Sequence, residues 1–82
     1  LDFYYGRVKD GIWAEWVFPS EGKGLEAVVS ITIRKDGSVR INGLEKPSGN
    51  ALFDRSALKA INRASPLEPP PFEVDIGIRF YL

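Results

Sequence analysis

The chain of 82 residues contains no cysteine, no histidine and no methionine. Zinc sites of the usual kind need cysteine or histidine ligands, and a Cys–His dyad or a Ser–His–Asp triad needs a histidine, so these sites are excluded. Cysteine usage likewise indicates no particular redox compartment. We therefore expect a protein that is not an enzyme, with no catalytic residues, no metal, no cofactor and no small-molecule substrate.

Excess charge and long apolar runs are also missing. Eleven basic and eleven acidic residues give a formal net charge of zero, which removes the electrostatic case for binding nucleic acid or an anionic membrane. No apolar run approaches the roughly 20 residues that a membrane helix needs, and we expect no signal peptide within these residues. The hydrophobic fraction of 44% is ordinary for a folded chain, and the length predicts one domain, residues 1–82.

The first 17 residues have apolar side chains at helical spacing. The predicted buried stripe consists of Leu1, Tyr5, Val8, Ile12 and Trp16. Trp13 lies off this stripe, and we expect it to be an accessory contact for a partner. Proline and glycine in residues 18–24 then predict a loop.

Residues 25–45 form a predicted β-hairpin whose register depends on the loop length. A two-residue loop would place Ile33 opposite Arg40 and mix the two faces of the sheet. A three-residue loop over residues 35–37 places Ile33 opposite Val39 instead. It also puts Gly37 at the left-handed position, where glycine is free of strain. The sequence therefore predicts the three-residue loop.

Residues 46–71 predict one helix that starts at Asn50 and ends before Pro66. Its apolar stripe consists of Phe53, Ala57, Ala60, Ile61 and Ala64. At 1.5 Å per residue this helix is about 22 Å long, enough to carry the chain back along one strand. The proline-rich segment after it predicts a stiff connector into the next strand.

Residues 72–82 alternate without interruption, as in a strand with one solvated face. The residues predicted to point inward are Phe72, Val74, Ile76, Ile78, Phe80 and Leu82. Beside the first strand, this segment completes an α+β domain of order α-β-β-α-β. The expected architecture is a three-stranded antiparallel sheet of order 2-1-3 with two helices packed on one face.

In that order the second and third strands are both sheet edges, and the sequence leaves open which of them a partner uses. The last strand is the longer and straighter edge, and its unpaired outer backbone is a template for an added strand. The candidate partner-binding residues are Glu73, Val74, Asp75, Ile76, Gly77, Ile78, Arg79, Phe80 and Tyr81. The side chains of Asp75, Arg79 and Tyr81 are candidates for selecting the partner. The alternative for Asp75 and Arg79 is that they discourage aggregation of an exposed edge.

Four stretches in order carry a family resemblance: "YYGRVKDGIWAEW", "VVSITIRKDGSVRI", "KPSGNALFDRSALKAINRASPLEPPP" and the terminal "IGIRFYL". Together they resemble the carboxy-terminal domain of the TonB and TolA proteins, over essentially the whole chain. TonB proteins usually have a Pro-x-Tyr-Pro motif before the first strand, where this chain has only Phe18-Pro19. The helix ending at Trp16 and the Ala64-Ser65-Pro66 exit favour the TolA-like branch.

The resemblance implies a periplasmic domain of an energy transducer that is anchored in the inner membrane. A proton-driven motor would act through an amino-terminal anchor absent from this chain, which begins at Leu1 without an initiator methionine. The chain is thus expected to be a fragment of a longer protein. Its implied partners are an outer-membrane transporter box peptide or Tol–Pal components, bound by strand addition, usually on the last strand.

Two other functions stay open from the residues alone. A small RNA-binding domain could use Arg34, Arg40, Arg79 and Tyr81 on the solvated sheet face, although zero net charge and the missing G-x-x-G clamp argue against it. A purely structural module could form a homodimer by pairing edge to edge.

Overall fold

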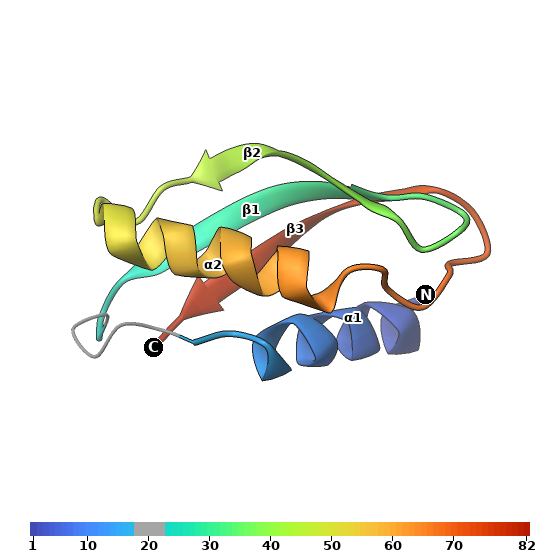
Figure 1. Cartoon of the computed structure of the whole chain (residues 1–82), viewed down its shortest axis with the longest axis horizontal. Coiled ribbons are helices and arrows are strands. Elements are labelled where there is room, and N and C mark those ends of the chain that lie inside the picture. The colour runs from blue at the N-terminus through green and yellow to red at the C-terminus, as the bar shows by residue number, and fades with distance from the viewer. Residues whose placement is uncertain (18–22) are drawn as a thin grey trace.

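The computed structural model describes residues 1–17 and 23–82. The elements are α1 (Asp2–Ala14), β1 (Glu26–Ile33), β2 (Val39–Lys46), α2 (Ala51–Ala64) and β3 (Val74–Tyr81). The sheet has the order β2-β1-β3 with both pairs antiparallel, and the two helices cover the same face (Figure 1). The predicted α+β architecture and strand order are confirmed. Most of the loop predicted over 18–24 lies outside the described residues.

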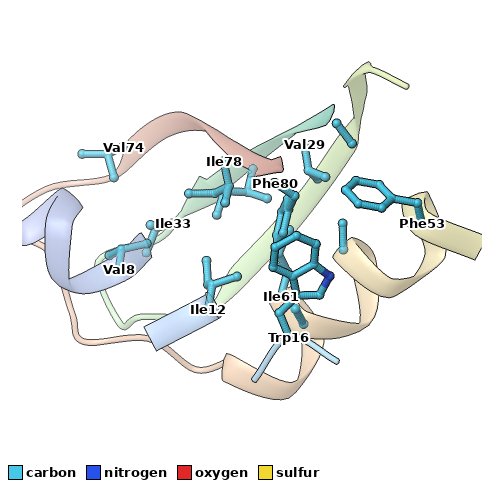
Figure 2. Packing of buried hydrophobic residues seen from close by; sticks show 14 of the residues in the cluster. Val8, Ile12, Trp16, Val29, Ile33, Phe53, Ile61, Val74, Ile78 and Phe80 are labelled. Atoms are coloured by element: carbon cyan, nitrogen blue, oxygen red, sulfur yellow. The ribbon is translucent and has the colours of Figure 1, made fainter. Parts of the chain in front are cut away.

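The core lies between the helices and the inward face of the sheet (Figure 2). Trp16, which follows α1, joins α2 and β3 there, because its ring contacts Phe53 of α2 and Phe80 of β3 edge-on, at centroid distances of 5.6 and 5.0 Å. Its indole N–H donates to Ser56 Oγ at 2.9 Å. Trp16 is therefore buried with its polar atom satisfied, as a core tryptophan requires.

The buried stripe of α1 differs from the prediction at its start. Tyr4, Val8 and Ile12 are the buried residues of the helix, whereas Tyr5 is half-buried and Leu1 is 50% exposed. Tyr4 can be buried because its hydroxyl donates to the Glu68 carbonyl at 2.8 Å. Burial is the main reason that the pKa of Tyr4 is raised.

The hairpin has the predicted register. Ile33 pairs with Val39 and Ile31 with Ile41, and Gly37 has φ of +89°. A second reason for glycine at position 37 is the proline-rich connector, since the Leu67 N–H donates to the Gly37 carbonyl at 2.8 Å. A Cβ at position 37 would collide with the carbonyl oxygen of Leu67. The connector is thus packed directly on the β1–β2 turn.

Helix α2 begins as predicted. The Asn50 side chain accepts a hydrogen bond from the Phe53 N–H at 3.1 Å, which caps the helix. Its buried residues are Phe53, Ala57, Ala60 and Ile61. Bonds from Tyr4 to the Glu68 carbonyl and from Leu67 to Gly37 then hold the connector in place, and the connector sets where β3 begins.

Strand β3 is shorter than the alternating pattern suggested. Val74, Ile78 and Phe80 are buried, and Ile76 is half-buried. Phe72 and Leu82, predicted to point inward, are 52% and 41% exposed. Both lie outside the strand, so the pleat that orients the other apolar side chains toward the core does not extend to them.

Candidate functional site

The outer flank of β3 is the candidate site, and the register shows which backbone groups point away from β1. The Arg34 N–H donates to the Ser38 carbonyl across the hairpin at 2.9 Å. Backbone groups alternate in direction along a strand, so those of Thr32, Ser30 and Val28 face β2. The residues of β1 between them face β3 and meet Val74, Ile76, Ile78 and Phe80.

The outward groups of β3 therefore belong to the alternate residues, which are Asp75, Gly77, Arg79 and Tyr81. Among the described residues, no backbone group outside the sheet forms a hydrogen bond with these outward groups. One side chain does bond to them, because the Trp13 indole N–H donates to the Arg79 carbonyl at 3.1 Å. This bond independently shows that the Arg79 carbonyl points away from β1.

A groove of about 300 Å³ lies between the first part of α1 and this edge. Its walls are Tyr5, Gly6 and Lys9 of α1 and Ile76, Gly77, Ile78, Arg79 and Tyr81 of β3. Figure 1 shows α1 below the sheet, on the side of β3. Helix α1 thus flanks the open edge without closing it along its length.

A cluster of aromatic side chains lies at the carboxyl end of β3, next to the groove. The Trp13 ring stacks on Phe80 with centroids 6.5 Å apart and meets Tyr81 edge-on at 5.0 Å. Lys9 Nζ lies 4.9 Å from the Trp13 ring centroid, and the Arg79 guanidinium lies 5.1 Å from that of Tyr81. The predicted accessory residue Trp13 therefore lies at the predicted edge.

The solvated face carries an ion-pair ladder across all three strands. Glu26 of β1 accepts from Lys46 of β2 at 2.6 Å and forms an ion pair with Arg79 of β3. Hydrogen bonds from Lys46 and then Arg79 lower the pKa of Glu26. The sequence did not predict a role for Glu26. The only indication in the sequence was an acidic residue on a strand whose two neighbours carry basic residues.

A second polar row crosses the same face. Thr32 Oγ1 donates to Asp75 Oδ1 at 2.5 Å and accepts from Asn42 Nδ2 at 3.0 Å. Arg40 in turn donates to Asn42 Oδ1 at 3.0 Å. Asp75 and Arg79, proposed from the sequence to select a partner, thus also have partners within the fold, and acidic groups alternate with the arginines on this face.

The other edge, β2, is irregular. Its register with β1 shifts between Val28 and Val29 and again between Ser30 and Ile31. Such bulges twist a strand and interrupt its outward row of backbone groups. The β1–β3 register has no shift over its whole length, so β3 is the more regular template of the two edges.

The described residues contain no group of three or more His, Cys, Asp or Glu that could hold a metal ion. Within the same residues, no helix has the length and apolar character needed to cross a membrane. A second hollow, lined by residues that include Arg7, Gly11 and Arg63, lies between the two helices, away from β3.

The order α-β-β-α-β, with both helices on one face and the last strand at a sheet edge, defines the fold class of TonB-type C-terminal domains. A model of the TonB C-terminal family matches residues 1–80, and the chain belongs to that family. Domains of this family are periplasmic and act as transducer domains rather than enzymes.

Two solution structures of the Helicobacter pylori TonB C-terminal domain are similar to this chain. The one of residues 179–285 is 25% identical with a TM-score of 0.73, over 98% of this chain and 79% of that chain. The one of residues 194–285 is 19% identical with a TM-score of 0.56, over 93% of this chain and 88% of that chain, and supports the fold. No curated protein matches the chain. The TolA-like branch favoured from the sequence stays a prediction.

Proposed function

We propose that this domain binds its partners by adding their extended segments as a strand to the outer edge of β3. The observation that carries the proposal is the regular row of outward backbone groups on Asp75, Gly77, Arg79 and Tyr81. Each added main-chain hydrogen bond contributes about 0.5–1.5 kcal/mol net, so a few of them support a transient grip.

The partner-binding surface is residues 73–81, with Trp13 as an accessory contact. Within it, Val74, Ile78 and Phe80 have buried side chains, so their part is to hold the strand in place. The exposed residues Asp75, Arg79 and Tyr81 present both backbone and side-chain atoms to a guest, and Gly77 presents its backbone alone. The irregular register of β2 makes that strand the weaker template.

In this proposal residues 1–82 are one domain of a longer, inner-membrane-anchored transducer. A proton-driven motor would act through the anchor and couple the proton-motive force to outer-membrane transport or envelope integrity. Family membership supports an outer-membrane transporter box peptide as the guest. Tol–Pal components would be the guests if the chain belongs to the TolA-like branch.

Amide NMR titration with synthetic transporter box peptides tests the proposal. We expect shifts confined to residues 73–81 and to the Trp13 indole N–H. Shifts centred on residues 38–44 would move the site to β2. Sizing at several concentrations separates this result from homodimer formation, which would broaden the same signals without peptide.

Two matched reagents test the pairing itself. Gly77→Pro removes an outward N–H that no described residue accepts, so the fold should survive while peptide binding is lost. On the peptide side, N-methylation of alternate residues should abolish binding for one alternate set and be tolerated for the other. Equal tolerance of both sets would exclude strand addition.

A further inference from the structure

Gly6 of α1 and Gly77 of β3 both line the groove between these two elements, and neither has a positive φ. Gly6 lies within α1, and a Cβ added there would have no neighbour within 4 Å. A Cβ added at Gly77 would lie 3.2 Å from Glu45 Oε2 and from Val28 Cγ1, so alanine fits only if these two side chains shift by a few tenths of an ångström.

Glycine inside a helix or a strand is less stable than alanine, because it loses more backbone freedom on folding. Without a local reason, such a glycine often marks a place where another chain or a ligand approaches closely. Gly6 and Gly77 both line the groove of about 300 Å³ that lies beside the outward backbone of β3. Gly6 has no local reason to be glycine, so its position points to the guest as the reason, while at Gly77 the guest adds to the crowding by Val28 and Glu45.

The pleat of an added strand determines which guest side chains each glycine would meet. A guest residue opposite Ile76 or Ile78 projects toward the helix face, into the space between these isoleucines and Gly6. The next guest residue lies opposite Gly77 and projects over the solvated face. There the missing side chain leaves the surface of Val28 open to it.

We propose that Gly6 and Gly77 are specificity-determining positions that make room for large apolar or aromatic side chains at consecutive positions of the bound segment. The groove wall of Ile76, Ile78 and Tyr5 is apolar, which matches an apolar side chain opposite Gly6. An aromatic ring across from a strand glycine covers the exposed backbone. This inference rests on the proposed strand addition at β3.

Gly6→Ala and Gly11→Ala form the matched pair that tests it. Gly11 lies in the same helix, is exposed and would also give a Cβ without neighbours, but it lines the hollow on the other side of α1. Both changes should raise the melting temperature, because alanine favours the helix. Only Gly6→Ala should weaken binding of the transporter box peptide selected by the titration above, by about fivefold or more.

Gly77→Ala gives the second readout. It should weaken the same peptide, and the loss should vanish for a peptide whose large residues are replaced by alanine. Gly6→Leu should block the groove more completely than Gly6→Ala.

Unchanged affinity in Gly6→Ala and Gly77→Ala, with shifts still at residues 73–81, would overturn this inference and leave the proposed function standing. If no transporter box peptide shifts those residues in the unmodified domain, the proposed function falls, and this inference with it.

Discussion

Trp13 has two effects on the open edge. Its ring packs against Phe80 and Tyr81, while its indole N–H occupies the outward carbonyl of Arg79. A guest backbone donor has to share or displace that bond, whereas the outward groups of Asp75 and Gly77 are open to it. The single indole therefore limits how far along β3 a guest can pair.

Trp13→Phe should keep the ring packing and remove the hydrogen bond. We expect a loss of about 0.5–1.5 kcal/mol in the free energy of unfolding, measured by urea denaturation. Trp16→Phe should lower the free energy of unfolding by more than Trp13→Phe, because Trp16 is buried and its indole N–H donates to Ser56. A Trp13→Phe domain as stable as the original would show that the bond makes no net contribution.

Gly37 should be the least replaceable glycine. In Gly37→Ala the alanine would have to adopt a positive φ, and its Cβ would collide with the Leu67 carbonyl. We therefore expect a loss of roughly 2–4 kcal/mol in the free energy of unfolding. Gly49 has the same φ of +89° with no atom near its Cβ. Gly49→Ala should therefore cost only about 1–2 kcal/mol. Equal losses in thermal or urea unfolding would show that the connector moves aside freely.

At the scale of elements, the ion-pair ladder joins the two outer strands through β1. Glu26 bonds both Lys46 and Arg79, and these bonds hold its pKa below its ordinary value of 4.5. A lowered pKa in the folded state stabilises the fold above the ordinary pKa, and this contribution disappears as the pH falls through the lowered value.

Glu26→Gln tests the ladder. The original domain should be more stable than this variant at neutral pH, and the difference should shrink below about pH 4.5 until it is lost at lower pH. Melting temperatures across this range give the measurement. High salt should reduce the same difference, because the pair is exposed. A difference that is constant with pH would exclude the ion pairs as its cause.

The elements predicted most accurately were those whose residues allow only one local structure. A two-residue loop would have mixed the two faces of the hairpin, which left the three-residue loop, and Asn50 was the residue able to cap α2. The stripe of α1 was predicted one position off at its start, because Tyr4 and Tyr5 differ only in which hydroxyl can reach the Glu68 carbonyl. That contact is between residues far apart in the sequence.

The edge position of the candidate site was predicted and is confirmed, whereas the use of that edge by a partner stays a prediction. Strand order and alternation indicated that β3 is an edge, and the resemblance indicated that it is used. The Trp13–Arg79 bond, the Glu26 ladder and the groove beside Gly6 depend on how α1 and the three strands lie relative to one another. Sequence spacing alone carries no information on these contacts.

At the scale of the whole molecule, α1 supplies a large share of a small core. A domain of this size buries only about 60% of its unfolded surface, and Tyr4, Val8, Ile12 and Trp16 are all buried residues from the first 17. Without them, the inner face of β3 and one side of α2 would be exposed to water.

A chain of residues 23–82 should therefore lose cooperative unfolding. We expect collapsed amide dispersion in NMR spectra and no sharp thermal transition, because several core side chains each contribute about 1.5–3 kcal/mol. Phe3→Ser in the full chain is the control, since Phe3 is 88% exposed and should change little. A well-dispersed spectrum for residues 23–82 would show that α1 is an appendage and not part of the core.

The unequal borders of the sheet also bear on solubility. Fibrous aggregates grow when each copy offers a usable border on both sides, so that every addition exposes a fresh one. Here β2 is interrupted by two register shifts, and β3 alone is regular. Two copies that pair through β3 would each have only the irregular β2 edge left for a further copy. Growth would therefore stop at a pair, and a high local concentration would not seed fibrils.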